Sequence, residues 1–270
     1  MTVKLFINIF SMEARKLITY RVKFWLNNVI GIFAQFMLMY FLWEAMFNAA
    51  DSDIIGGMDF GDMMLYYSLV IVFSRIVCSN HREGFVSREI YDGSMSRYLV
   101  YPTSYLHFKY AQYLAGMIPA LVQMIIFMTL IPFFVGYSGT SGITVNTILM
   151  TIVSLLAANY LHFIIQICIE AIAFWAENIW SLLLMFRIIN TFLGGFMIPL
   201  TLFPAWGQQM LAVLPFKYLF FIPVQTALGK VSFLDWLVSL VITLLWCYAI
   251  LIISRVIWRR GDLKYTGVGI

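Results

Sequence analysis

The chain has 270 residues, of which 62% are hydrophobic and only 11% are charged, and its formal net charge is +4. A soluble domain carries about 25% charged residues, so this chain has too few charges to cover a water-facing surface and is predicted to lie in a lipid bilayer. Its cations fall at predicted membrane boundaries, which leaves no basic face for nucleic acid and excludes that class of partner.

Six apolar stretches are long enough to cross the hydrocarbon core as helices, which takes about 20 apolar residues each. The predicted spans are Phe24–Phe47, Phe60–Ser79, Leu106–Val135, Ile143–Phe174, Ile179–Pro199 and Phe233–Ile257. The third and fourth exceed the minimum length and are expected to tilt or to extend past the bilayer. The predicted fold is an all-α integral membrane protein, in which residues 1–270 form a single transmembrane domain.

The segment before the first span, residues 1–21, has apolar residues at near-helical spacing with charged residues between them. These apolar residues are Leu5, Ile9, Met12 and Leu17. The pattern predicts a helix that lies in the membrane interface. An ordinary charged flank of the first span is the alternative.

The cations predict the orientation of the spans. Most of the 17 Lys and Arg residues precede the first span, lie in or beside the link between the second and third spans, or follow the sixth span. If the spans alternate, these three places lie on one side, while Asp51, Asp53 and Asp59 lie in the first loop of the other side. The positive-inside rule therefore predicts that both termini are cytoplasmic.

The link between the second and third spans, residues 81–102, is the only substantial cytoplasmic loop. We expect Ser87 to cap a short helix that runs through Arg97, is limited by Gly93 and ends before Pro102. The link mixes charges of both signs with apolar residues. The residues alone favour a docking surface and a solvated loop equally.

The segment between the fifth and sixth spans, residues 199–232, is apolar but interrupted by Pro199, Pro204, Pro215 and Pro223. No piece of it is long enough to cross the bilayer. Broken apolar segments are typical of short re-entrant helices that dip into the outer leaflet while protein shields their ends. A single distorted span would instead place the C-terminus outside, and the cations after Trp258 argue against it.

One face of the fourth span carries polar residues at helical spacing: Asn159, His162, Gln166 and Glu170. Arg187, in the fifth span, is expected to lie at a depth where it can meet Glu170. A charge inside the membrane is costly unless it is paired or wetted. The polar face therefore predicts either a seam that holds the fourth and fifth spans together or a wetted wall of a substrate pathway.

The sequence carries no motif of an enzyme active site. Its three His residues have no metal-ligand spacing, and its three Cys residues lie within spans without the spacing of a zinc site. No Gly-rich phosphate-binding loop is present, so the chain is not expected to bind ATP itself. Any energy for transport must come from a gradient or from a partner protein.

Four passages together resemble one known family. They are SREIYDGSMSRYLVYPTSYLHF (Ser87–Phe108), AFWAENIW (Ala173–Trp180), the outer Pro-rich segment from Gly194 to Gly229, and the tail WRRGDLKYTGVGI from Trp258. In order and spacing they resemble the ABC-2 type permeases, the membrane subunits of bacterial ABC exporters. Each passage is degenerate, but their succession from about residue 80 to the end of the chain makes the resemblance specific.

The resemblance implies an interfacial connecting helix near the N-terminus, a coupling helix within residues 81–102 and re-entrant outer helices. It also implies a unit of two permease chains and two ABC ATPase subunits in the bacterial cytoplasmic (inner) membrane. ATP and Mg would bind the ATPase subunits, with no cofactor on this chain. The substrate would then move outward between the two permease chains.

On the same basis, the expected ATPase contacts are charged and apolar residues of the link. They are Arg82, Glu83, Phe85, Arg88, Glu89, Ile90, Asp92, Met95 and Arg97. A gradient-driven carrier or channel, and a membrane anchor subunit without a pathway, are the rival functions. The exported substrate, and whether the second permease chain is identical or a sister chain, stay open.

Overall fold

The computed structural model describes residues 3–19, 21–50, 53–79, 84–101, 104–135 and 144–265. At residues 3, 17–19, 21–28, 99 and 128–135 it describes the backbone alone. The described residues form helices and connecting turns, and no β-strand is found among them.

The longer helices are α1 (Val3–Thr19), α2 (Arg21–Ala50), α3 (Phe60–Val77), α6 (Tyr105–Ala115), α7 (Met117–Val135), α8 (Val145–Glu170), α9 (Trp180–Leu193) and α12 (Phe233–Asp262). The shorter helices are α4 (Ser87–Tyr91), α5 (Ser96–Leu99), α10 (Ala205–Val213) and α11 (Phe221–Ala227), with the 3₁₀ turns η1 (Ala171–Phe174), η2 (Leu200–Leu202) and η3 (Phe216–Tyr218).

Five helical segments are long and apolar enough to cross a membrane. They are Val29–Ala50, Phe60–Val77, Tyr105–Phe127, Val145–Phe174 and Phe233–Asp262. A sixth is obtained if α10 and the helix after it, which are bent by 81° to each other, count as one span. These five segments correspond to the predicted first, second, third, fourth and sixth spans, so a multi-pass membrane protein is confirmed.

The predicted fifth span differs from the structure. The expected helix over Ile179–Pro199 is α9, which begins at Trp180 and ends at Leu193 before Gly194 and Gly195. Its 14 residues cover about 21 Å, which is less than the hydrocarbon core of about 30 Å. The predicted span was too long because the apolar composition continues past Leu193. Glycine ends a helix without making the segment polar.

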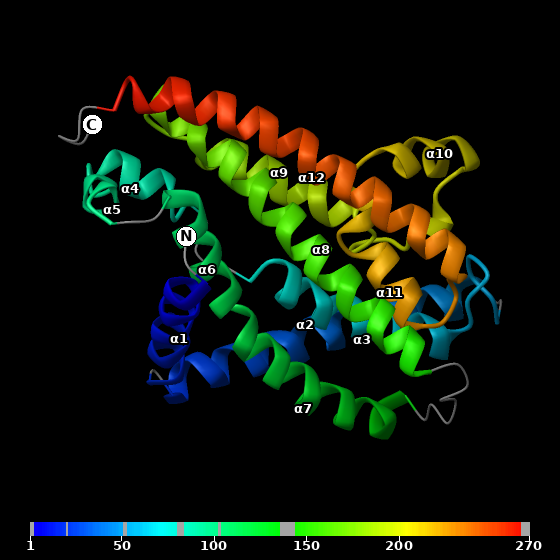
Figure 1. Ribbon diagram of the computed structural model, residues 1–270. Coiled ribbons are helices and arrows are strands. Elements are labelled where there is room, and N and C mark those ends of the chain that lie inside the picture. Colours follow the sequence, from blue (N-terminus) through cyan, green and yellow to red (C-terminus); the bar gives the residue numbers. More distant parts are fainter. Residues whose placement is uncertain are drawn as a thin grey trace.

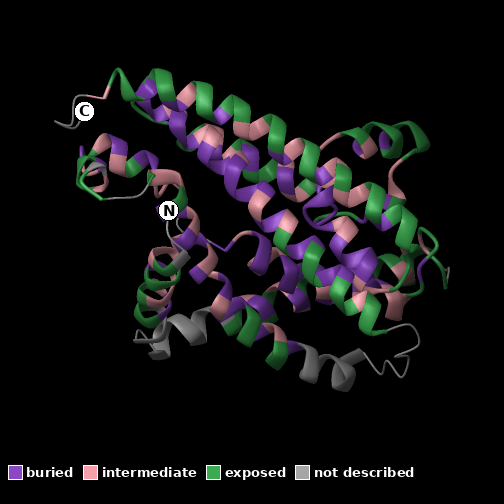
Figure 2. Ribbon diagram, viewed as in Figure 1, coloured by how far each residue is buried: buried purple, intermediate pink, exposed green. Residues whose placement is uncertain are grey.

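The central helices of the bundle are α3 and α8, and α2 and α12 lie at its periphery (Figures 1 and 2). In the spanning windows of α3 and α8, 61% and 56% of the residues are buried, against 17% for α2 and 22% for α12. The exposed faces of the peripheral helices are apolar, as at Leu38 of α2 and Leu245 of α12. Such faces suit lipid or another membrane chain rather than water.

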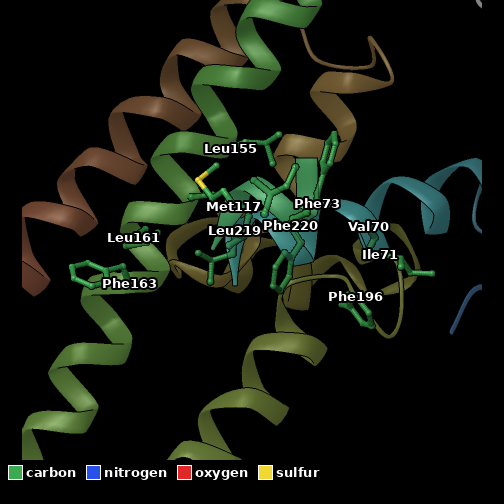
Figure 3. Packing of buried hydrophobic residues seen from close by; sticks show 14 of the residues in the cluster. Val70, Ile71, Phe73, Met117, Leu155, Leu161, Phe163, Phe196, Leu219 and Phe220 are labelled. Carbon is green, nitrogen blue, oxygen red and sulfur yellow. The ribbon is translucent and has the colours of Figure 1, made fainter. Parts of the chain in front are cut away.

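The core brings residues from distant parts of the sequence together, and Figure 3 shows a part of it. The labelled side chains are Val70, Ile71 and Phe73 of α3, Met117 of α7, Leu155, Leu161 and Phe163 of α8, and Phe196, Leu219 and Phe220 of the segment after α9. Since Leu219 and Phe220 are fully buried, the segment between α9 and α12 is part of the bundle and not a loop on its surface.

The segment 199–232 is broken into short helices, as its prolines predict. Pro204 immediately precedes α10, Pro215 precedes η3, and Pro223 lies in the first turn of α11. Two phenols of α3 hold the turn just before this segment. The hydroxyl of Tyr66 donates to the carbonyl of Gly195 at 2.6 Å, and that of Tyr67 donates to the carbonyl of Met197 at 2.9 Å.

The helices α1, α4 and α5 and the last turn of α12 lie at the same end of the molecule (Figure 1). We call this end the link end. The turn around residues 53–59 and the connection from α11 to α12 lie at the opposite end (Figure 1). The arrangement brings the link, α1 and the end of α12 together, while the side of the membrane on which they lie stays a prediction.

Candidate functional site

The described part of the link, residues 84–101, contains two short helices instead of the single helix expected from Ser87 to Arg97. α4 ends at Tyr91 and α5 begins at Ser96. Gly93 lies between them with a φ of 67°, a left-handed conformation that glycine adopts without steric cost. Gly93 therefore ends the first helix and turns the chain into the second.

Glu170, at the end of α8, holds the start of α4. Its Oε2 accepts hydrogen bonds from the backbone N–H of Val86 at 2.6 Å and of Ser87 at 3.1 Å. Its Oε1 accepts one from the amide of Gln166 at 2.8 Å. The first N–H groups of a helix lack acceptors within the helix. The fully buried Glu170 carboxylate is the acceptor for those of α4. The end of α8 is thereby fastened to the link.

Glu89 of α4 joins the link to α6 through a buried ion pair. The Nζ of Lys109 lies 2.6 Å from Glu89 Oε1, and the two side chains are only 2% and 16% exposed. The hydroxyls of Tyr98 and Tyr105 also donate to this carboxylate, at 2.9 Å and 2.6 Å. Burial and the Glu89 carboxylate raise the pKa of the Tyr98 phenol above its ordinary value of 10.0, so this phenol stays a neutral donor.

The ammonium group of Lys109 is also enclosed by aromatic rings. It lies 4.7 Å from the ring centroid of Tyr98, 5.1 Å from that of Phe85 and 5.4 Å from that of Tyr105. A cation is attracted to the face of an aromatic ring, and more strongly when it is removed from water. Lys109 is therefore a structural cation of the link end.

The tail after α12 contacts the link as well. The hydroxyl of Tyr265 donates to the carbonyl of Gly93 at 2.6 Å and accepts a hydrogen bond from the N–H of Ser96 at 3.1 Å. The ring of Phe174 packs against Tyr265 and against Trp258 of α12, with centroids 6.3 Å and 5.3 Å apart. The link is thus connected to α6, α8 and α12.

The predicted charged contacts of the link divide into three groups. Arg88, Asp92 and Arg97 are exposed and are available to a partner. Glu89 is instead an internal anchor, because both its carboxylate oxygens bind groups of this chain. Arg82 and Glu83 lie outside the described residues.

The predicted apolar contacts are not on the surface. Ile90 and Met95 are each only 2% exposed and belong to the main hydrophobic core. Phe85 is half-buried against the same core and Lys109. The prediction that Ile90 and Met95 contact a partner is therefore wrong for this conformation, because short helices at the end of a bundle bury their apolar side in their own protein. The surface left for a partner carries the charges of Arg88, Asp92 and Arg97, together with the exposed Val100 and Tyr101 at the end of the described link.

The polar face of α8 packs against the end of α3. The side-chain amide of Asn159 donates to the carbonyl of Ile76 at 2.9 Å and to the hydroxyl of Ser79 at 2.7 Å. The last carbonyls of a helix lack partners within it, and Asn159 satisfies one of them at the end of α3.

His162 extends the same contact. One ring nitrogen lies 2.8 Å from the hydroxyl of Tyr113, which donates to the carbonyl of Val77 at 2.7 Å, and the other lies 3.3 Å from the sulfur of Cys78. The polar face is therefore a buried seam between the fourth and second spans. A polar seam was expected between the fourth and fifth spans, but the polar partner of the fourth span is the second span. Helical spacing shows which residues share a face but not which helix they meet.

The expected meeting of Glu170 with Arg187 is replaced by other contacts. Glu170 binds α4 and Gln166, as described above, while Arg187 is exposed on α9. Asn159, His162, Gln166 and Glu170 are all buried within the chain. A role for these five residues in a substrate pathway stays a prediction.

An apolar hollow of about 300 Å³ lies between α8, α9, η3 and α12. Ile165, Ile169, Phe186, Phe216 and Ile250 are among the side chains that line it, and none of its lining residues is titratable. Among the residues that the structure describes, no cluster of three or more His, Cys, Asp or Glu side chains is placed to hold a metal ion.

Sequence reasoning missed Lys109, Tyr105 and Tyr265 as site residues. Lys109 was only one of the cations counted in or beside the link between the second and third spans. Tyr265 lies in a recognised tail motif, but no pattern in the sequence named its partners. Its position one turn after a basic helix end is the only local signal for a contact with the link.

A comparison with protein-family models matches residues 33–269 to the family described as ABC-2 family transporter protein. The match covers the five spanning segments almost completely, together with the link and most of the tail. Among curated proteins, no match to the chain was found.

Proposed function

Because the chain belongs to the ABC-2 transporter family, we propose that it is the permease subunit of an exporter whose ATPase subunits dock on the link. Its membership makes the chain a membrane permease subunit of an ABC transporter, and the family works with ABC ATPase subunits. The direction of transport, the docking site and the assembly are the parts that we propose.

The connection of the link to three helices carries this proposal. Glu170 ties it to α8, Glu89 ties it to α6 and Tyr265 ties it to the end of α12. Arg88, Asp92 and Arg97 remain exposed on the same element. A surface loop without a partner has no need of buried charged anchors, whereas a docking element that transmits force needs both rigidity and an exposed face.

The charges of the exposed face suit recognition of a charged groove. Charged groups at the rim of an interface mainly set orientation, pairing and rate of association. ATP and Mg would bind the ATPase subunits, and closure of these subunits would displace the link. The displacement would then reach α6, α8 and α12 through the three anchors.

We place the substrate pathway between two permease chains, identical or sister. The polar face of α8 is enclosed within one chain, whereas the exposed faces of α2 and α12 are apolar. These faces are available to lipid and to a second permease chain. The polar residues of α8 would act on the pathway indirectly, by fixing α3 against α8.

The remaining elements fit an exporter permease in the bacterial cytoplasmic membrane with both termini cytoplasmic. α1 packs Ile9 against Phe108 of α6 while Ile7 and Met12 are exposed, as suits a helix in the membrane interface. The outer segment would be re-entrant, since α10 and the helix after it are bent by 81° and protein buries Leu219 and Phe220.

Purification of the tagged chain from its native membrane in mild detergent, followed by mass spectrometry, tests the proposal. We expect an ABC ATPase subunit to copurify in stoichiometric amount, with a second permease present if the pair is made of sister chains. A chain that purifies alone and moves a solute across vesicle membranes without ATP would contradict the proposal and favour a gradient-driven carrier.

A further inference from the structure

The tail after the last span contacts the turn between the two short helices of the link and the first residue of α5. We propose that Tyr265 is a positioning residue that locks the link to α12, so that the two move as one unit during transport. This proposal rests on the docking of an ATPase at the link, as proposed above. It assigns to the tail a role in coupling ATP hydrolysis to movement of the membrane helices.

The hydroxyl of Tyr265 bridges the two ends of the turn that leads into α5. It donates to Gly93, the residue at which α4 turns into α5, and accepts from the N–H of Ser96, the first residue of α5. A phenol can donate and accept at the same time, and the first N–H groups of a helix need partners outside the helix. One side chain therefore holds the turn from Gly93 to Ser96 that joins α4 to α5.

The backbone and the packing around Tyr265 are themselves fixed. The N–H groups of Lys264 and Tyr265 donate to the carbonyl of Gly261, at 2.8 Å and 3.1 Å. Gly261 lies against the ring of Phe174, and a Cβ at this position would overlap that ring. The close contact of Gly261 with Phe174 and the edge-to-face contact of Phe174 with Tyr265 set the direction in which the tail leaves α12.

The helix that Tyr265 engages reaches the opposite end of the molecule. α12 has 30 residues and is about 45 Å long. Further along it, the indole N–H of Trp246 donates to the carbonyl of Val213, the last residue of α10, at 2.9 Å. A rigid helix fixed to the link at one end and to the outer segment further along provides a physical connection between them.

The relative motion of the link and α12 tests the proposal. The three native cysteines are first replaced by alanine. New cysteines are then introduced in place of Val100 of the link and Leu263 of the tail, which are both highly exposed, and each carries a spin label. The labelled chain is purified together with its ATPase and placed in lipid nanodiscs. The distance between the labels and the rate of ATP hydrolysis per bound ATPase are then measured.

Two variants are compared in this background. Tyr265→Phe keeps the ring against Phe174 and removes only the hydroxyl. Tyr248→Phe is the matched control, because it makes the same change on an exposed residue of α12, the helix that the tail follows. A merely structural effect would lower the amount of complex, whereas the proposal requires the amount of bound ATPase to stay unchanged.

We expect Tyr265→Phe to broaden the distance distribution and to lower ATP hydrolysis per bound ATPase by about fivefold or more, which is the lower range of allosteric couplings. Tyr248→Phe should change neither. A normal distribution, or a broadened one with unchanged hydrolysis, would overturn the proposal. Absence of an ATPase from the unsubstituted complex would instead contradict the docking function, and the positioning role would fail with it.

Discussion

The link and the outer segment are the two irregular parts of the bundle, and different chemistry holds each of them. The link has charged anchors beside the Tyr265 phenol: the buried Glu89–Lys109 pair and the Glu170 carboxylate on the N–H groups of α4. The outer segment and the turn before it are held by neutral donors: Tyr66 and Tyr67 of α3 and Trp246 of α12 each bind a backbone carbonyl. Both segments also bury apolar side chains in the same core.

The difference follows from what surrounds each segment. Hydrogen bonds with a charged partner are roughly twice as strong as neutral ones, which suits the force that we propose an ATPase exerts on the link. A segment that lies among apolar helices has no water to solvate a charge, so neutral phenol and indole donors satisfy its carbonyls at lower cost. We therefore expect the link to depend on a few charged residues and the outer segment on many weaker contacts.

The largest effect is expected at Glu89. Glu89→Gln leaves the Lys109 ammonium buried without a carboxylate, and breaking a buried pair in this way costs about 3–5 kcal/mol of folding free energy. The control is Asp62→Asn at the opposite end, whose pair with Lys230 at 3.3 Å is exposed and worth about 0–1 kcal/mol. Thermal unfolding in detergent measures both, and equal shifts in Tm would contradict the assigned difference between the two ends.

A smaller loss of stability is expected in the outer segment. Tyr66→Phe removes the donor to the Gly195 carbonyl, and leaving a buried acceptor unpaired costs about 1–3 kcal/mol. ATPase copurification should stay at the unsubstituted level, since Tyr66 lies away from the link. Loss of the ATPase together with a normal Tm would show that the outer segment acts on docking directly.

Gly261→Ala should lower the unfolding temperature to a similar extent. The added methyl overlaps the Phe174 ring, and overpacking costs about 1–3 kcal/mol. Gly207→Ala in α10 is the matched control, because a Cβ there makes only ordinary contacts and alanine favours a helix by about 1 kcal/mol over glycine. If Gly261→Ala left Tm unchanged in the same unfolding assay, the close contact between α12 and Phe174 would be contradicted.

The smallest effect on folding is expected at the exposed charges of the link. The double variant Arg88→Glu with Arg97→Glu should change stability by no more than about 0.5 kcal/mol while reducing ATPase copurification. Lys230→Glu reverses an exposed charge at the opposite end and should leave copurification unchanged. Full retention of the ATPase by the double variant would mean that these arginines do not form the docking face.

Hydropathy predicted five of the spans, and charge predicted that the link and the tail lie at the same end of the molecule. Both features depend on composition alone. The same reasoning extended the fifth span past Leu193, since Gly194 and Gly195 end the helix within an apolar run. Proline positions predicted the broken outer segment. Such features are local, so the sequence displays them directly.

The roles within the site depend on tertiary contacts and were harder to predict. Helical spacing grouped Asn159 with His162 on one face, but it did not show that α3 would be their partner. The mixed charge of the link was interpreted as a surface property, although Glu89 binds Lys109 inside the protein. Ile90 was expected to contact a partner because nothing in the sequence distinguishes an apolar residue that faces a partner from one that faces its own core.

Site-specific photo-crosslinking in the native membrane tests most directly whether the link end receives the ATPase. A photoreactive amino acid is placed at Arg97 of the link and, as a matched exposed position in the outer segment, at Trp206. We predict a crosslink to the ABC ATPase subunit from position 97 and none from position 206. A crosslink from position 206 alone, or an ATPase that copurifies without any crosslink from position 97, would contradict the assignment of the link as the docking element.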